Sequence, residues 1–285
     1  MNRILGKRRL GPGIWEYVLE APDIARAARS GQFAVLRLHE AGERIPLTIV
    51  ETDPRSGSVK LVVQEIGKTT REMAAQFHVG DCILDFAGPL GEPSRIERYG
   101  TAVCIGGRVG IAPLFPIARD LKSAGNEVVV ILGARSAEFL FYERKMAAVC
   151  DRLYTVTDDG SRGERGFTSD VLRRLVDSDQ RIDRVWAIGP PIMMKVCAEA
   201  TRFAGIPTVV SLNPIMVDGT GMCGGCRVDV GAKMRFACVD GPEFDGHQVD
   251  FDRLMARLRY YARCEAEAAD RYEERIGSQN REDAR

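Results

Sequence analysis

The most informative segment for the fold reads TAVCIGGRVGIAP over residues 101–113. It combines the apolar residues of a short buried strand, a glycine-rich turn, and a proline suited to the first turn of a helix. Further strands are expected at 127–132, 153–157, 185–188 and 208–210, alternating with helices at 113–124, 137–149, 169–176 and 191–203. Strands that alternate with helices form a parallel, doubly wound sheet, so we expect an α/β domain at residues 98–211.

The glycine-rich turn is a candidate site for a nucleotide diphosphate. Gly106, Gly107 and Gly110 leave backbone amides free at the start of a helix, where an anion could bind. The Gly-x-Gly-x-x-Gly fingerprint is absent, and an ordinary strand–helix turn is the alternative. The next strand ends in Gly133-Ala134-Arg135-Ser136, where nucleotide folds meet the adenosine ribose. Arg135 could hold a 2′-phosphate there, or it could be a solvated loop residue.

Residues 1–97 are expected to form a small antiparallel barrel. Short strands bounded by glycine and proline turns are indicated at 14–19, 33–38, 58–63 and 81–86, with a single helix at 69–77. Two segments, Arg44-Ile45-Pro46-Leu47-Thr48 and Gly67-Lys68-Thr69-Thr70, could together bind a diphosphate through an arginine and a helix N-terminus. From spacing alone, an ordinary loop and a helix capped by Thr69 are the simpler interpretation.

Residues 212–250 lose the strand–helix alternation and contain a metal-binding pattern. Cys223 and Cys226 form a CxxC motif between glycines, and Cys238 follows twelve residues after Cys226. Asp218 stands five residues before Cys223 and could be the fourth ligand of an iron–sulfur cluster, because iron accepts carboxylate oxygen. Spacing alone leaves open a zinc site with the same thiolates, with Asp218 as a surface turn residue and the fourth ligand from Cys264 or water.

The C-terminal residues 251–285 are expected to form one long polar helix. Its apolar positions lie at helical spacing and mark one face: Phe251, Leu254, Met255, Leu258 and Tyr261. Such a helix could dock a partner protein or fold against the chain's own cysteine-containing lobe.

The composition of the 285 residues excludes several functional classes. Lys plus Arg and Asp plus Glu are each 40, so the formal net charge is zero and nucleic acid is not an indicated partner. No apolar run reaches the length of a membrane span, and a signal peptide is absent, so we expect a cytoplasmic protein with reduced cysteines. The remaining cysteines fit buried positions and the histidines are isolated: Cys82, Cys104, Cys150, Cys197, His39, His78 and His247.

Taken in order, these motifs resemble those of the ferredoxin-reductase superfamily, and within it the family of dihydroorotate dehydrogenase electron-transfer subunits. The likeness is closest to the branch formed by the alpha subunits of NADH-dependent ferredoxin:NADP oxidoreductases. It covers residues 1 to about 250 and implies an FAD-binding barrel, an NAD(P)-binding domain and a 2Fe–2S lobe. It also implies a larger partner subunit that resembles the glutamate synthase small subunit, carries FAD and 4Fe–4S clusters, and connects the complex to ferredoxin.

The resemblance also assigns residues to each cofactor. On the flavin side it implies three groups: Arg44, Pro46, Leu47 and Thr48; the strand residues Val62, Val63 and Gln64; and the diphosphate turn of Gly67, Thr69 and Thr70. On the nucleotide side it implies the loop of Gly106, Gly107, Val109, Gly110 and Pro113, the loop of Asp158, Asp159 and Gly160, and the turn Gly189-Pro190-Pro191, which follows Ile188 where the family has cysteine. For the cluster it implies Asp218, Cys223, Cys226 and Cys238.

Asp218 is a departure from dihydroorotate-type subunits, which carry a fourth cysteine at that position. An aspartate there is what the resemblance to the alpha subunits implies, and it favours 2Fe–2S over zinc. We therefore expect a subunit that moves electrons among NAD(P)H, FAD and the cluster without a catalytic acid or base. The alternatives are a dihydroorotate dehydrogenase subunit and, in a different class, a zinc-stabilised binding module. Arg135 favours NADPH, whereas the resemblance favours NADH.

Overall fold

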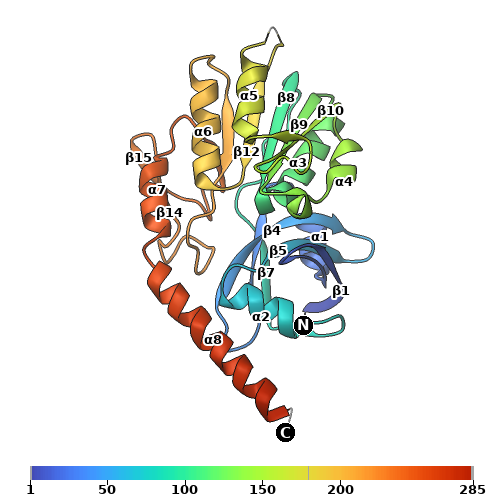
Figure 1. Cartoon of the computed structure of the whole chain (residues 1–285), viewed down its shortest axis with the longest axis vertical. Coiled ribbons are helices and arrows are strands. Elements are labelled where there is room, and N and C mark those ends of the chain that lie inside the picture. The colour runs from blue at the N-terminus through green and yellow to red at the C-terminus, as the bar shows by residue number, and fades with distance from the viewer. Residues whose placement is uncertain (1, 179, 284–285) are drawn as a thin grey trace.

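The computed structural model describes residues 2–178 and 180–283, with side chains described as far as residue 274. Its N-terminal part is a nearly closed antiparallel barrel, blue in Figure 1. The hydrogen-bonded order of its strands is β6 (Cys82–Ile83), β1 (Asn2–Gly11), β2 (Ile14–Glu20), β5 (Ser58–Gln64), β4 (Arg44–Asp53), β3 (Phe33–Arg37) and β7 (Asp85–Leu90). Alternating apolar side chains such as Tyr17, Leu19 and Leu61 fill the barrel, as expected for strands with one buried face.

The barrel contains elements that the sequence did not indicate. Strand β1 was missed because Ile4 is the only fully buried residue among its ten, which leaves no apolar alternation to detect. A second helix, α1 (Pro22–Ala27), accompanies the expected α2 (Lys68–Gln76), so the expectation of a single helix is wrong. Proline at the start of α1 suits a first helical turn, but six residues are too few for a recognisable helical periodicity. The expected strand at 81–86 is divided into β6 and β7.

The second sheet is the expected parallel, doubly wound one. Its strand order is β11 (Glu164–Arg165), β10 (Arg152–Thr157), β9 (Glu127–Ala134), β8 (Thr101–Gly107), β12 (Arg184–Ile188), β13 (Thr208–Ser211) and β16 (Glu243–Asp245). All neighbours are parallel except the pair β13 and β16, which is antiparallel. The chain moves outward from β8 to β10 and then crosses to the other side at β12. The carboxyl ends of β8 and β12 therefore form the switch point at which such sheets bind ligands.

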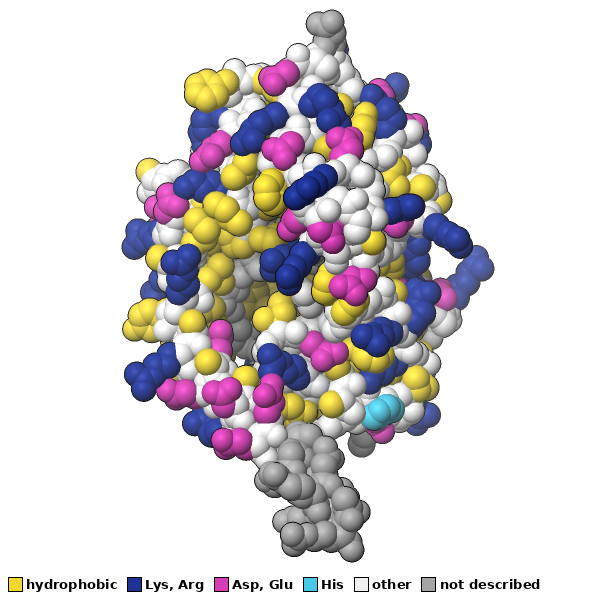
Figure 2. All heavy atoms as spheres, in the orientation of Figure 1, with side chains coloured by type: hydrophobic (Ala, Val, Ile, Leu, Met, Phe, Trp, Pro, Cys, Tyr) yellow, Lys and Arg dark blue, Asp and Glu magenta, His cyan; other side chains and the backbone are white. Residues whose placement is uncertain are grey.

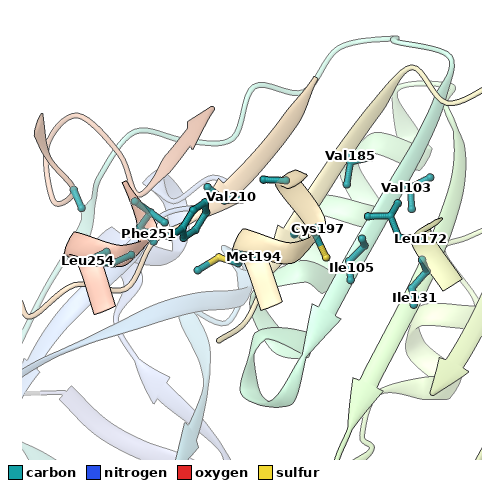
Figure 3. Packing of buried hydrophobic residues seen from close by; sticks show 14 of the residues in the cluster. Val103, Ile105, Ile131, Leu172, Val185, Met194, Cys197, Val210, Phe251 and Leu254 are labelled. Carbon is teal, nitrogen blue, oxygen red and sulfur yellow. The ribbon is translucent and has the colours of Figure 1, made fainter. Parts of the chain in front are cut away.

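Helices cover both faces of this sheet (Figure 1). Helices α3 (Ile111–Ser123) and α4 (Glu143–Ala147) pack on the face that carries Val128 and Val130. Helices α5 (Thr168–Val176) and α6 (Pro191–Arg202) pack on the opposite face against Ile105 and Ile131, and Figure 3 shows this layer with Leu172, Met194 and Cys197. The alternation along buried parallel strands places successive residues in these two cores.

The expected helix at 137–149 is wrong in its first half. The segment forms a single turn, η2 (Ala137–Phe139), and only then α4. Between them Tyr142 has a left-handed backbone with φ 62°, which a continuous helix cannot contain. The Tyr142 side chain is buried, and its hydroxyl donates to the Glu16 carboxylate of β2. A long-range contact with the barrel therefore accompanies the break.

An ionic network continues this contact between the barrel and the nucleotide-type domain. Lys145 Nζ of α4 lies 2.6 Å from Glu51 Oε2 of β4, and Lys60 Nζ of β5 lies 2.7 Å from the same oxygen. Although burial opposes it, donation from Lys145 and Lys60 lowers the pKa of Glu51 below its ordinary value. Charged partners from both domains meet in this partly buried region, so the network favours one relative orientation of the two sheets.

The C-terminal lobe joins the second sheet through β16 and adds the hairpin of β14 (Arg227–Val230) and β15 (Lys233–Phe236). The expected single helix at 251–285 is wrong: α7 (Phe251–Leu258) and α8 (Ala262–Asp283) are separate helices. Asp250 caps α7 by accepting from the Arg253 amide at 2.9 Å, and Phe251 and Leu254 are buried beside Val210 and Met194 (Figure 3). Helix α8 leaves the lobe and passes the barrel at α2 (Figure 1). In the described part of the chain, no helix has both the length and the apolar character of a membrane span.

Candidate functional site

A pocket of about 490 Å³ lies where the barrel, the switch point of the parallel sheet and the C-terminal lobe meet. Figure 2 shows a hollow between the lobe and the two sheets, with apolar side chains gathered around it. The residues expected from the sequence that line this pocket are Pro46, Leu47, Thr48, Val62, Gln64, Thr70, Gly107, Val109, Gly110, Pro113, Gly189 and Pro190. The folded chain therefore brings together motifs that are more than a hundred residues apart in the sequence.

The floor of the pocket is the turn between β8 and α3. Its first residues form a short 3₁₀ turn, η1 (Arg108–Gly110), in which Arg108 has a positive φ of 54°. A Cβ on Gly110 would lie 2.3 Å from the Ile188 carbonyl oxygen, so only glycine lets η1 approach the end of β12 this closely. A Cβ on Gly106 would likewise lie 3.0 Å from Ile111 Cα. The glycines therefore place the start of α3 against the switch point, where backbone amides can face an anion.

The opposite wall comes from the barrel. Thr48, Val62 and Gln64 line it from β4 and β5, and the turn before α2 closes its edge. The Thr70 hydroxyl oxygen accepts from the Ile66 amide at 3.0 Å and the Gly67 amide at 3.2 Å, which fixes this turn. A Cβ on Gly67 would meet nothing within 4 Å, so the space in front of the turn is open to a ligand.

Several expected flavin-side residues do not line this pocket. The Val63 side chain is buried in the barrel core, on the opposite face of β5 from Val62. Thr69 is buried, and its hydroxyl donates to the Glu43 carboxylate. Arg44 lies exposed at the start of β4, outside the lining. Val63 and Thr69 can therefore contribute backbone atoms only.

The second group of expected nucleotide residues forms a separate cluster. Gly133 lies near the end of β9, Arg135 and Ser136 follow that strand, and the loop of Asp158, Asp159 and Gly160 follows β10. The Asp158 amide donates to the Ala134 carbonyl at 3.1 Å, so the two loops are side by side at the carboxyl ends of adjacent strands. The Ser161 hydroxyl holds the pKa of the Asp159 carboxyl below its ordinary value. These loops lie outside the lining of the main pocket.

Sequence reasoning missed other residues that line the pocket. They come from the barrel, from the turn after β8 and from the chain after β13: Phe33, Ile66, Arg108, Ser211, Asn213, Met216 and Pro242. Arg108 lies within the quoted glycine-rich segment and Ile66 directly precedes Gly67, so both could have been included on that ground. Phe33 comes from β3 of the barrel, and the others are brought to the pocket by the end of β13 and the chain that follows it into the lobe, for which the sequence carries no local signal.

Two of the three cysteines in the metal-binding pattern lie side by side. Cys226 Sγ and Cys238 Sγ are 3.1 Å apart and both residues are buried, whereas Cys223 is exposed. The Cys238 amide donates to Cys226 Sγ at 3.5 Å, and the Gly225 amide donates to Cys223 Sγ at 3.4 Å, so backbone amides face the sulfur atoms. Burial, with the neighbouring Cys226 thiol, raises the pKa of Cys238 to about 12, which means that a bound cation is needed to stabilise its thiolate.

The Asp218 carboxylate lies in the same loop. It accepts from the Thr220 amide at 2.8 Å and the Cys223 amide at 2.9 Å, and these amides lower its pKa below the ordinary value. Within the described residues, no three histidine, cysteine or acidic side chains stand in metal-binding geometry. Asp218, Cys223 and Cys226 lie in one loop, and Cys238 follows the β14–β15 hairpin. Three sulfur donors and one carboxylate are nevertheless a donor set that iron accepts, so the residues fit the group chemically.

Next to Cys223 is a second cavity of about 450 Å³, lined by Arg227, Arg257, Tyr260 and Tyr261 among others. Arg257 of α7 donates to the Gly225 carbonyl at 3.4 Å, so a guanidinium lies against the CxxC segment. Cys264, the other candidate ligand, is exposed on α8 and does not line this cavity. Of the remaining cysteines, Cys104 and Cys197 are buried as expected and Cys150 is half-buried, but Cys82 is exposed, so that expectation is wrong for Cys82.

An antiparallel barrel, a parallel sheet with a pocket at its switch point, and a cysteine lobe together define an electron-transfer protein of the ferredoxin-reductase type. The sequence model of the iron–sulfur cluster binding domain of dihydroorotate dehydrogenase B matches residues 213–250. The chain is also 47% identical, over 95% of both lengths, to the Thermotoga maritima homolog of the dihydroorotate dehydrogenase B (NAD(+)) electron transfer subunit. The chain therefore belongs to the family of dihydroorotate dehydrogenase B electron-transfer subunits.

Two further similarities bear on the branch of this family. A solved chain from the NADH-dependent reduced ferredoxin-NADP oxidoreductase, a protein of flavin-based electron bifurcation, is 46% identical, with a TM-score of 0.90 and coverage of 95% of this chain and 98% of that one. The dihydroorotate dehydrogenase B (NAD(+)) electron transfer subunit of Geobacillus thermodenitrificans is 32% identical over 86% of this chain and 96% of its own length. The relatives are oxidoreductase subunits, and flavin, nicotinamide nucleotide and iron–sulfur electron transfer is the chemistry of the family. The iron–sulfur match favours that cofactor class over the zinc alternative.

Proposed function

We propose that this protein moves electrons between NAD(P)H, FAD and a 2Fe–2S cluster as the alpha subunit of an NADH-dependent ferredoxin:NADP⁺ oxidoreductase. The observation that carries the proposal is the pocket in which β4, β5 and the start of α2 face the carboxyl ends of β8 and β12. Such a pocket lets two ring systems lie in contact between two domains, which is what direct transfer between a nicotinamide and a flavin requires.

The flavin side of the proposal uses both side chains and backbone. Pro46, Leu47, Thr48, Val62 and Gln64 form the wall that would contact the isoalloxazine ring, and Val63 contributes backbone within the same strand. The Gly67–Thr70 turn offers the amides of a helix start to the diphosphate, and Thr69 contributes through its backbone. Arg44 is proposed as a charge partner of that diphosphate.

The nicotinamide side is proposed in two parts. The turn of Gly106, Gly107, Val109, Gly110 and Pro113 and the turn of Gly189 and Pro190 would hold the nicotinamide and diphosphate at the switch point. The paired loops of Gly133, Arg135 and Ser136 and of Asp158, Asp159 and Gly160 would hold the adenosine end. Arg135 would favour a 2′-phosphate. Titration of the protein with NADH and with NADPH tests which nucleotide it prefers.

Asp218, Cys223, Cys226 and Cys238 are the proposed cluster ligands. We also propose the division of the chain into a flavin barrel (1–97), a nucleotide domain (98–211), a cluster lobe (212–250) and a C-terminal helical segment (251–285). A flavin held in this pocket would supply acceptance of a hydride from a nicotinamide and transfer of single electrons to an iron–sulfur centre. The chain's own residues bind and orient these groups, and no side-chain acid or base is needed.

The proposed partner is a larger flavoprotein subunit that resembles the glutamate synthase small subunit and carries FAD and 4Fe–4S clusters, with ferredoxin reacting through the complex. The proposed location is the cytoplasm, where eight free thiols remain reduced. The second candidate is the electron-transfer subunit of an NAD-dependent dihydroorotate dehydrogenase, which the domain match at 213–250 and the Geobacillus relative favour. Co-purification of the tagged chain separates the two, since one predicts an iron–sulfur flavoprotein and the other a barrel-type dihydroorotate subunit.

The first test is the content of the purified protein. The proposal predicts stoichiometric FAD, two irons per chain, and bleaching of the flavin absorption by NADH or NADPH. A colourless protein that contains zinc would overturn it.

The second test addresses Asp218. Asp218→Cys is expected to retain a cluster with a shifted midpoint potential, and Asp218→Ala is expected to lose iron rapidly. Asp240→Ala is the matched control, because Asp240 also accepts a backbone amide in this lobe, from Phe236 at 2.7 Å. An unchanged spectrum and iron content in Asp218→Ala would show that Asp218 is not a ligand.

A further inference from the structure

Helix α8 makes a specific contact with α2, the helix that begins at the proposed flavin diphosphate site. Arg71 of α2 pairs with Glu273 of α8, and Gln76 Nε2 donates to the Tyr272 hydroxyl at 3.5 Å. Tyr272 is 7% exposed and is the one buried side chain among residues 262–274 of α8. The contact is therefore small and depends mainly on a single aromatic residue.

The barrel holds α2 from the other side. Met73 is fully buried in the barrel core, and the Tyr17 hydroxyl donates to the Met73 carbonyl at 2.9 Å. Lys7 Nζ donates to the carbonyls of Ala74 and Phe77, at 2.5 and 3.0 Å, and so caps the C-terminal end. These bonds fix the inner face and the end of α2 that is remote from the proposed diphosphate site.

The other end of the C-terminal segment is attached to the cluster lobe and the sheet. Asp252 of α7 pairs with Lys195 of α6 at 2.8 Å, and Arg253 pairs with Asp229 of β14 at 3.1 Å. Arg257 contacts the Gly225 carbonyl in the CxxC segment. Residues 251–274 therefore extend from the cluster lobe to the outer face of α2, as Figure 1 shows for α7 and α8.

We propose that α8 is an intramolecular support that holds α2 in its flavin-binding position, with Tyr272 and Glu273 as positioning residues. A helix of nine residues is not stable alone in water, so its orientation depends on the tertiary contacts on both of its faces. Binding of a diphosphate by amides at its first turn requires that turn to be held within a fraction of an ångström. The inference rests on the proposed flavin site at Gly67–Thr70.

The experiment compares Tyr272→Ala and Glu273→Lys with the matched control Glu267→Lys in the full-length chain. Glu267 is on the same helix, and its ion pair is with Arg263 of that helix, so the same charge change there leaves the α2 contact intact. The measurements are the rate of FAD release, followed by the rise in flavin fluorescence on dilution, and amide hydrogen exchange of residues 68–76.

Tyr272→Ala is expected to release FAD about tenfold faster, since tenfold corresponds to about 1.4 kcal/mol and truncation of a buried aromatic costs more than this. Glu273→Lys is expected to accelerate both FAD release and exchange in α2, because it places a cation opposite Arg71. Glu267→Lys and Tyr272→Phe, which retains the buried ring, are expected to behave like the wild type.

The possible failures are distinguishable. A wild-type chain that binds no FAD would overturn the proposed function and this inference with it. A wild type that binds FAD, together with unchanged release and exchange in Tyr272→Ala and Glu273→Lys, overturns the inference alone. Normal FAD retention combined with loss of binding to the larger subunit also overturns it, because α8 would then be a docking element for the partner.

Discussion

Substitution of Gly110 by alanine tests the geometry of the switch point directly. Gly110 has φ −60° and ψ −13°, values that alanine adopts without strain. The effect of Gly110→Ala is therefore steric. Its added Cβ would lie 2.3 Å from the Ile188 carbonyl oxygen, 2.7 Å from the carbonyl carbon and 2.9 Å from Gly189 Cα. All three are backbone atoms, so no side-chain rotation relieves the contact.

The turn and the end of β12 must separate by about 1 Å to reach ordinary contact distance. Overpacking of this kind costs roughly 1–3 kcal/mol. A loss of about 2 kcal/mol corresponds to a decrease in Tm of about 3 °C in a chain of this size. Because both segments line the proposed nicotinamide site, a displacement of about 1 Å is expected to slow flavin reduction by NAD(P)H on the order of 100-fold.

The assay combines thermal unfolding with stopped-flow reduction of the bound flavin. Gly67→Ala is the control for the thermal unfolding alone, since a Cβ there meets nothing within 4 Å and the φ of −100° is ordinary, whereas its place in the proposed diphosphate turn excludes it as a control for flavin reduction. It is expected to change stability by less than about 1 kcal/mol. If Gly110→Ala melts and is reduced like the wild type, the close approach of η1 to β12 does not shape the site.

Three further substitutions have expected outcomes. Burial raises the pKa of Glu243 despite donation from Ser94, so the wild type loses stability as pH rises from about 4.5 through the folded-state pKa. Glu243→Gln lacks this ionisable group and should therefore become increasingly more stable than the wild type over that range, which thermal melts between pH 4 and 8 would show. Tyr142→Phe removes a bond to the buried Glu16 carboxylate and should cost roughly 1.5–3 kcal/mol in urea unfolding, whereas a change within error would mean that this contact does not hold the two domains together. Arg257→Gln should lower the midpoint potential of the cluster by tens of millivolts in a redox titration, because about 1 kcal/mol of lost charge stabilisation equals roughly 40 mV for one electron. An unchanged potential would count against a role for this guanidinium.

The sequence predicted the elements whose periodicity is local. The strands β2, β3 and β5 carry apolar, branched and aromatic residues between turn residues, and the strands of the parallel sheet are short apolar runs separated by helices. It failed where the pattern is weak or interrupted. Strand β1 has one fully buried residue, and the breaks at Tyr142 and between α7 and α8 occur inside segments of continuous helical character. At Tyr142 a buried long-range contact outweighs helical propensity.

The same division applies to the candidate site. The spacing of Cys223, Cys226 and Cys238 and the Gly106–Gly110 turn are local features, so the sequence alone indicated a cysteine-ligated centre and a nucleotide-type turn. Only the tertiary structure showed that the barrel wall faces that turn, that Val63 and Thr69 point away from the pocket, and that α8 contacts α2. Local patterns follow from the 2- and 3.6-residue periods of strands and helices. The way in which the two sheets and the lobe bury their apolar surfaces decides which distant faces come into contact. No short segment of sequence encodes this arrangement by itself.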